Sequence, residues 1–179
     1  IVNAISRLDI SRQWGSGKTS GSDGQRFEYK RKSINQTYST KFGDFALEFY
    51  TFVADNYAPY YSTPIECTER DAPYALDGIL YNESDLEIEE HYTDTHGFME
   101  INFTAFTMLG KKHVPRIRDI QRQWIYRIDK NKNYASLMPL VSPNNRTIHM
   151  DWIVEQRDRM GQFYASFESG HITASTALK

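Results

Sequence analysis

Cysteine is nearly absent from the chain of 179 residues, since Cys67 is its one cysteine. A single thiol excludes an internal disulfide framework and a metal site built from several thiolates. Long apolar runs are absent too, because nothing approaches the roughly 18 consecutive apolar residues that a membrane-spanning helix needs. We therefore expect no membrane partner.

A leader segment is not visible either. The sequence begins Ile-Val-Asn-Ala, with no Met, no basic segment and no apolar segment of a signal peptide. At the other end, Thr173 to Lys179 reads as the first turns of a helix. These features predict an excised piece of a longer, cytoplasmic protein.

An excess of charge of one sign is also lacking, because the formal net charge is −2. A nucleic-acid partner therefore has to be argued from local patches of basic residues. Hydrophobic residues make up 40% and aromatic residues 14% of the chain, which excludes a disordered protein. The length predicts one well-cored domain with, at most, the beginning of a second piece.

Three runs with strand character lie in the first third of the chain. They cover Gln25–Tyr29, the surroundings of Gln36–Phe42, and Phe45–Ala54. In the last run, Leu47, Phe49, Thr51 and Val53 alternate with Glu48, Tyr50 and Phe52, as on the two faces of a strand. Gly15–Gly24 is rich in Gly and Ser, and it predicts a turn or loop before the first strand. The short polar links favour an antiparallel meander.

Helices and strands then alternate. Asp71 and Pro73 open a predicted helix, Leu86–Thr93 is a predicted strand, and Val114–Ile120 is a predicted fifth strand. Between the last two, a helix is expected from Phe98 to Gly110, which stops it. A long amphipathic helix is expected over Asp151–Ser169. The apolar faces of the three helices are predicted to be Ala72, Leu76, Ile79 and Leu80; Phe98, Ile101, Ala105, Met108 and Leu109; and Ile153, Met160, Phe163, Tyr164 and Phe167.

This order of elements is that of the ribonuclease-H-like fold, an α/β fold with a mixed sheet. Its first and fourth strands lie side by side, so the fold would bring Asp23 and Asp94 together. From Asp129 to Asn145 the chain is polar and rich in turns. We therefore predict a core over residues 1–129 and the beginning of a helical insertion over residues 130–179.

Two aspartates are the candidate metal ligands. Asp94 follows a predicted strand in Glu90-His91-Tyr92-Thr93-Asp94-Thr95-His96-Gly97, and Asp23 lies in Ser22-Asp23-Gly24. Convergent carboxylates can hold divalent cations that stabilise the attacking and leaving oxygens of a DNA phosphate. Two alternatives stay open: Asp23-Gly24 is also a turn signal, and Asp94 could cap the following helix.

Two other sites are disfavoured. Gly17-Lys18-Thr19 ends like a P-loop, but Arg12 stands where that motif needs its first Gly. His91 and His96 could join Asp94 as zinc ligands, but on a strand His91 and Asp94 face opposite ways and no third strong ligand is near. His96 stays a candidate for contacting a phosphate or the water shell of a metal.

Basic residues gather in two places, over residues 111–132 and in a smaller group that begins at Arg26. Such a stretch is either a solvated face or a strip that contacts phosphates. Trp124 and Tyr126 could stack on bases or pack in the fold. The candidate DNA-contacting residues are Arg26, Lys111, Lys112, Arg116, Arg118 and Arg122.

Taken together, several segments resemble the catalytic domain of Tn-three family transposases, in order and over essentially the whole chain. They are Trp14-Gly15, Ser22-Asp23-Gly24-Gln25-Arg26-Phe27, Leu76-Asp77-Gly78-Ile79-Leu80, Glu90 to Gly97, and Pro115-Arg116-Ile117-Arg118-Asp119. The resemblance implies a DDE transposase of ribonuclease-H-like fold whose first two catalytic aspartates match Asp23 and Asp94. It also implies dependence on magnesium, with manganese as a substitute, and nicking and strand transfer in replicative transposition.

The partners that this resemblance implies are the terminal inverted repeats of a transposon and target DNA, bound by an oligomeric protein in the bacterial cytoplasm. The family's catalytic glutamate lies in an Arg-Glu-Leu-Gly-Arg-Ile-Glu-like stretch, which this chain lacks, and neither Glu155 nor Glu168 matches it. The chain alone is thus expected to be inactive. Two alternatives remain: a non-catalytic DNA-binding or assembly module, and a ribonuclease-H-like nuclease that cuts without joining.

Overall fold

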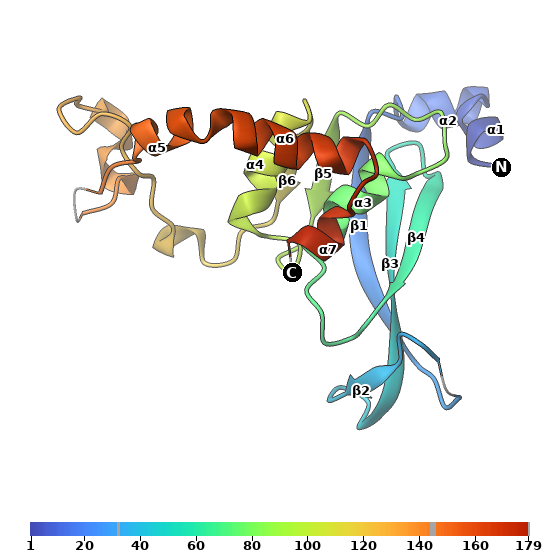
Figure 1. The fold of residues 1–179 in the computed structure, drawn as a ribbon. Helices are drawn as coiled ribbons and strands as arrows, with labels where there is room; N and C mark the ends of the chain where they lie inside the picture. Colours follow the sequence, from blue (N-terminus) through green and yellow to red (C-terminus); the bar gives the residue numbers. More distant parts are fainter. Residues whose placement is uncertain (32, 144–145, 179) are drawn as a thin grey trace. The chain divides into compact units, whose positions relative to one another are not determined.

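A computed structural model describes residues 1–31, 33–143 and 146–178. The chain forms two compact units, Ile1–Arg116 with Tyr164–Lys179, and Ile117–Phe163. The first unit contains a six-stranded mixed sheet (Figure 1). Among the residues that the structure describes, no helix has the length and apolar character needed to cross a membrane.

The elements of the first unit begin with two short helices and end with a third. In chain order they are α1 (Val2–Ser6), α2 (Asp9–Trp14), β1 (Thr19–Glu28), β2 (Thr37–Ser39), β3 (Asp44–Ala54), β4 (Pro59–Ile65), α3 (Tyr74–Leu80), β5 (Glu90–Thr93), α4 (Glu100–Met108), β6 (Lys112–Pro115) and α7 (Ala174–Ala177). The second unit holds the 3₁₀ helices η1 (Ile120–Arg122) and η2 (Ala135–Leu140) and the helix α5 (Met150–Glu155). Helix α6 (Arg157–Glu168) begins in the second unit and ends in the first.

The strand order of the sheet is β2-β3-β1-β5-β6, and β4 pairs with β3. β1 is antiparallel to β3, whereas β5 runs parallel to both β1 and β6. This mixed sheet with interleaved helices confirms the predicted α/β class and is consistent with the ribonuclease-H-like fold. The predicted neighbours, the first strand and the strand before Asp94, do lie side by side (Figure 1).

The predicted strands of the meander need correction at three places. Residues 19–24, predicted as part of a loop, belong to β1, so Asp23 lies within a strand. The run around Gln36–Phe42 contributes only the short β2. A strand that the sequence analysis missed, β4, begins at Pro59 and contains Pro64. Within the described residues β4 pairs with β3 alone, so it is an edge strand, and an edge strand tolerates proline.

The inward face of the helix before Gly110 was predicted correctly for Ala105 but wrongly for Ile101 and Met108. Gly110 does follow its end, in the left-handed region with φ +68°. The buried residues of α4 are Asn102, Ala105 and Phe106, while Ile101 and Met108 are exposed. Asn102 turns inward because its Nδ2 donates to the Ala72 carbonyl oxygen at 2.7 Å. The face of α3 was predicted correctly for Ala72, Leu76 and Ile79, which are all buried.

Two later elements also differ from the prediction. β6 ends at Pro115, so the predicted strand Val114–Ile120 is wrong beyond that residue. The helix predicted over Asp151–Ser169 is interrupted at Gln156 between α5 and α6. Of its predicted inward residues, Tyr164 and Phe167 are buried, while Ile153 and Phe163 are exposed. The predicted division at residues 129 and 130 stays a prediction.

The core of the first unit is organised around a row of stacked rings. His91 of β5 lies between Phe52 of β3, at 5.3 Å between ring centroids, and Phe106 of α4, at 6.1 Å. Phe106 stacks in turn on His113 of β6 at 4.7 Å. Helix α3 joins this core closely, because a methyl group at Gly78 would overlap the ring of Phe52.

This close approach predicts that Gly78→Ala destabilises the protein by about 1–3 kcal/mol, because the Phe52 ring is fully buried and cannot move aside freely. Gly161→Ala is the matched control. Gly161 is also helical, and an added methyl group there would meet nothing within 4 Å. Gly161→Ala should therefore raise the free energy of unfolding by about 0.5–1 kcal/mol. Urea denaturation followed by circular dichroism compares the two variants. Equal unfolding free energies would contradict this packing.

Candidate metal centre

Asp23 and Asp94 follow the same register position on two neighbouring parallel strands. The pairing of β1 with β5 ends at Ser22 and Thr93. Asp23 directly follows Ser22, and Asp94 directly follows Thr93. Both line one cavity of about 260 Å³. The other residues that line it are Gly24, Arg26, Lys41, Glu48, Asp71 and His96. The fold therefore brings the two predicted aspartates to a common site.

A buried hydrogen-bond network links the strands beneath this site. His91 of β5 lies 2.8 Å from the hydroxyl oxygens of both Ser20 and Ser22 of β1, through its two ring nitrogens. Ser22 donates to the Tyr50 hydroxyl at 2.7 Å, and the Tyr60 hydroxyl donates to Ser20 at 3.0 Å. Burial lowers the pKa of His91 to about 3, so the ring is neutral. His91 is thus a core residue, and both of its ring nitrogens are engaged by serine hydroxyls.

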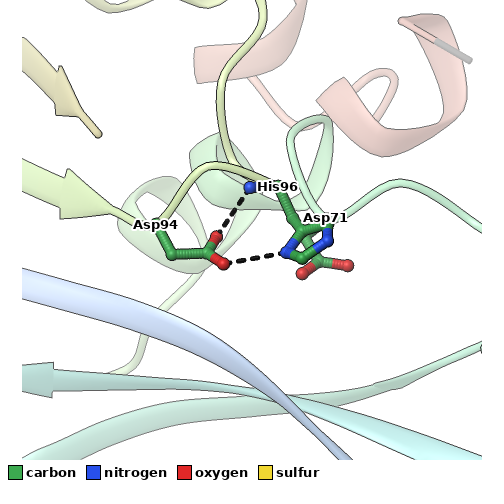
Figure 2. Close-up of side chains that lie close together, drawn as sticks. All are labelled: Asp71, Asp94 and His96. Atoms are coloured by element: carbon green, nitrogen blue, oxygen red, sulfur yellow. Dashed lines mark hydrogen bonds and ion pairs between the residues drawn. The ribbon is translucent and has the colours of Figure 1, made fainter. Parts of the chain in front are cut away.

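Asp94 shapes the turn that follows β5. Its Oδ1 accepts a hydrogen bond from the backbone N–H group of Gly97 at 3.2 Å. Figure 2 shows its two contacts with His96: Oδ1 accepts from the backbone N–H group at 2.9 Å, and Oδ2 lies 2.9 Å from Nδ1. Helix α4 begins only at Glu100, so the alternative that Asp94 caps this helix is wrong. Partial burial acts to raise the pKa of Asp94, but these hydrogen bonds outweigh it and the pKa lies below its ordinary value.

The contact with Asp94 shifts the pKa of His96 upward, the opposite direction to the shift of Asp94. The hydrogen bond to Asp94 and the charge of that carboxylate raise the pKa of His96 above its ordinary value. The imidazole is largely exposed, so it is free to meet a ligand. A histidine with a raised pKa is protonated more often at neutral pH than a free one, which suits contact with a phosphate or with a water near one.

Asp71 is the residue of this site that the sequence analysis missed. One carboxylate oxygen of Asp71, one of Asp94 and one ring nitrogen of His96 all lie within 4.8 Å of one another. Figure 2 shows the Asp71 carboxylate beside the His96 ring. Asp71 was assigned only to the opening of a helix, but α3 has Pro73 at its N-cap and no side-chain cap. No motif marks this residue, because only the folded chain places it beside Asp94.

Burial sets the acidity of Asp71. Burial raises the pKa of this carboxyl to about 6, and the negative charges of Glu48 and Asp94 add to the effect. Gly24 leaves the space that these groups occupy, because a side chain there would collide with the Glu48 carboxylate and come within 3.1 Å of Asp71 Oδ2. Glycine beside Asp23 is therefore a steric requirement of the site and not the turn signal that it suggests in the sequence.

Asp23 is less closely held than Asp94. Its side chain is exposed, and its Oδ1 accepts from the N–H of Gly24 at 2.9 Å. It lines the shared cavity and also a wider hollow of about 700 Å³, which Thr51, Val53 and Tyr92 line as well. Its carboxylate is not among the three groups that lie within 4.8 Å of one another.

Three of the candidate DNA-contacting residues already have partners. Arg26 Nε pairs with the buried Glu48 carboxylate at 2.6 Å, and this hydrogen bond raises the pKa of Arg26. Lys111 Nζ donates to the Ile88 carbonyl oxygen at 2.7 Å. Lys112 pairs with Glu90 at 2.6 Å on the surface.

The other three candidates are Arg116, Arg118 and Arg122, and all are exposed. Arg116 belongs to the first unit, and Arg118 and Arg122 belong to the second. Within residues 1–31, 33–143 and 146–178, none of the three guanidinium groups makes a hydrogen bond or an ion pair. These groups are therefore available to a phosphate backbone.

The donor set of the centre fits a divalent cation. Carboxylate oxygens suit magnesium, and a set that adds an imidazole suits manganese as well. Asp71 is a buried carboxylate in a position where a cation would relieve the cost of its charge. Asp71, Asp94 and, in its unprotonated form, His96, with Asp23 beside them, are the residues of this chain that could hold such an ion.

Comparison with known proteins gives a consistent result. The family model of the Tn3 transposase DDE domain matches residues 1–179. The chain is 37% identical over 187 residues to the transposase for transposon Tn3926 of Escherichia coli and 36% identical over 184 residues to that for transposon Tn501 of Pseudomonas aeruginosa. The transposase for transposon gamma-delta of Escherichia coli (strain K12) is 29% identical over 181 residues. Each match covers 100% of this chain and 18% of the relative.

The chain thus spans about 18% of the length of these relatives. No solved structure matches the chain. A DDE domain implies dependence on a metal, and the group formed by Asp71, Asp94 and His96 is a candidate acidic centre for it.

The pKa of Asp71 makes a prediction for stability. The ordinary value is 3.8, and the folded value is about 6. Between these two values the folded chain keeps a proton that the unfolded chain has released, so the free energy of unfolding falls as pH rises and stays lowered above the folded pKa. Asn cannot ionise. Asp71→Asn should therefore be more stable than the unsubstituted chain at about pH 7.5, by about 1–3 kcal/mol, and the difference should vanish below about pH 4.

Melting temperatures measured across this pH range check the prediction, with Asp85→Asn as a control at an exposed carboxylate. A difference between Asp71→Asn and the unsubstituted chain that stays constant at every pH would show that burial does not raise the pKa of Asp71.

Proposed function

The chain belongs to the Tn3 transposase DDE domain family, and on that premise we propose that it supplies two catalytic aspartates, Asp23 and Asp94, for nicking transposon ends and joining them to target DNA. The observation that carries this proposal is the parallel pairing of β1 and β5. It puts Asp23, which lies within β1, beside Asp94, which directly follows β5, and both aspartates line one cavity. Two-metal phosphodiester chemistry requires such convergence of carboxylates.

In this proposal Asp23 and Asp94 hold magnesium, together with an acidic residue from another part of the full protein. When bound, the metal lowers the pKa of water and stabilises charge on the attacking and leaving oxygens of the phosphate. The chain itself keeps the two aspartates at a fixed separation, because the buried contacts of His91 with Ser20 and Ser22 join their strands. Such positioning supplies a large part of the rate of phosphoryl transfer.

His96 and Lys41 extend the proposal to the phosphate. Both line the cavity that contains the two aspartates. The raised pKa of His96 favours the imidazolium form, which can donate a hydrogen bond to a phosphate oxygen. Asp94 orients this ring through its Oδ2, so one carboxylate holds metal and positions a donor.

The DNA contacts in this proposal come from the exposed arginines. Arg116, Arg118 and Arg122 have no ion pair within the described segments and follow β6, the neighbour of β5. Arginine binds phosphate oxygens in a bidentate manner, which positions DNA without reading its sequence. The substrates are terminal inverted repeats and target DNA, bound by an oligomeric, DNA-associated enzyme in the cytoplasm. The relatives, which are transposases for transposons of bacteria, support DNA as the substrate.

The experiment that tests the proposal replaces each aspartate by asparagine in a full-length transposase that contains this domain. The amide introduced by Asp94→Asn keeps an oxygen that can accept from the N–H groups of His96 and Gly97, so the turn survives while the charge is lost. We expect nicking and strand transfer to fall at least about a thousandfold in Asp23→Asn and Asp94→Asn, because several kcal/mol of charge stabilisation disappear.

Binding to the inverted repeats, measured by gel shift, should stay unchanged in both variants, and Asp85→Asn serves as the active control. A rate of strand transfer equal to that of the unsubstituted enzyme in Asp94→Asn would leave a structural role for Asp94. Nicking that persists without joining would favour a nuclease.

A further inference from the structure

Three carboxylates are buried in the part of the chain that the structure describes, and they differ in how their charges are satisfied. Glu48, Asp71 and Asp77 are 2%, 6% and 5% exposed. Glu48 pairs with Arg26 at 2.6 Å. Asp77 accepts from the N–H groups of Ala174, at 2.7 Å, and Ser175, at 3.3 Å. Both therefore have partners inside the fold.

Asp71 has no such partner. Its carboxylate makes no hydrogen bond and no ion pair with any residue that the structure describes. The two nearby groups that can carry positive charge have other partners: Arg26 is held by Glu48 and the His96 ring by Asp94, while Glu48 itself adds a repulsive charge. Buried charges in proteins are normally paired or bound to a metal, since an isolated one is costly. A carboxylate that is kept in this state indicates a missing cation.

The position of Asp71 shows where that cation would lie. One of its oxygens lies within 4.8 Å of a carboxylate oxygen of Asp94 and of a ring nitrogen of His96 (Figure 2). All three residues line the same cavity. Two oxygens bound to one ion at about 2.1 Å each can be no more than about 4.2 Å apart, which is close to this spacing. Small side-chain movements would bring both carboxylates onto one ion.

We infer that Asp71 is a third carboxylate ligand of the divalent-cation site, so that Asp71 and Asp94 bind one cation without any residue from outside this chain. This inference rests on the proposed function, because it concerns the same site. It adds a ligand from the segment before α3, which neither the motifs nor the strand order had suggested. It also gives the space beside Gly24 a purpose, because that space admits Asp71 Oδ2 next to β1.

The inference is tested with Mn²⁺ on the 179-residue chain, followed by electron paramagnetic resonance of the free ion. The variants are Asp71→Asn, Asp94→Asn and Asp71→Ser, with Asp85→Asn as a matched control on the surface. We expect Asp71→Asn and Asp94→Asn each to weaken Mn²⁺ binding about tenfold or more, as loss of a ligand does, and Asp85→Asn to leave it unchanged. Asp71→Ser provides a second variant without charge if Asn disturbs folding.

A second readout separates ligand loss from damage to the fold. Removal of a buried, unpaired charge should raise the melting temperature of the metal-free chain, so Asp71→Asn should gain stability while losing the increase that Mn²⁺ gives the unsubstituted chain. A merely structural role for Asp71 predicts the opposite: a lower melting temperature and an unchanged response to Mn²⁺.

Two results would overturn the inference. One is Mn²⁺ affinity in both Asp71 variants equal to that of the unsubstituted chain, with a loss in Asp94→Asn. In that case Asp94 remains a ligand and the proposed function stands without Asp71. The other is a chain that binds no Mn²⁺ at millimolar concentration, which shows that the site needs ligands from elsewhere. The activity of Asp23→Asn and Asp94→Asn in the full-length enzyme then still decides the proposed function.

Discussion

The two hydrogen bonds of His91 with Ser20 and Ser22 are the constraint on which the site depends. They join β5 to β1 from within the core, at 2.8 Å on each side of one ring. A slip of one residue between these strands would move Asp94 by about 3.3 Å along the sheet relative to Asp23 and would turn every side chain of β5 to the other face. The ring cannot satisfy both of its nitrogens in such a register.

The aromatic packing around His91 strengthens this constraint. Phe52 and Phe106 stack on its two sides, and burial keeps the ring neutral. A neutral imidazole can donate with one nitrogen and accept with the other, which matches two serine hydroxyls. The same ring therefore packs in the core as an aromatic group and joins two strands of the sheet through its hydrogen bonds. Histidine is suited to both uses because its ring is flat and carries two nitrogens.

Much of this arrangement could be predicted from the sequence, because the local signals agreed with the fold. The helix through Leu76 and the neighbouring positions of the first and fourth predicted strands were correct. The strand predicted over Leu86–Thr93 was correct only from Glu90 onward. Asp23 was misplaced in a loop because Gly21 and Gly24 have low strand propensity. Pairing with β3 on one side and β5 on the other overrides that preference.

The features that could not be predicted arise from contacts between distant segments. Strand β4 was hidden by Pro59, which is acceptable as the first residue of a strand, and by Pro64, which is acceptable because the strand lies at the edge of the sheet. Asn102 faces inward because a carbonyl oxygen of a remote residue, Ala72, needs a donor. Asp71 becomes a candidate metal ligand only because its carboxylate has no partner among the described residues of the folded chain. No local sequence pattern encodes such an absence.

The most direct test of the central claim, that Asp23 and Asp94 converge on a divalent cation, is anomalous diffraction from a manganese-soaked crystal of this chain. The account predicts a manganese peak in the cavity that the two aspartates share, at about 2 Å from a carboxylate oxygen of Asp94 and on the side that Asp23 faces. Well-ordered aspartates whose carboxylates point to separate regions, with manganese bound only at other surface sites, would contradict it.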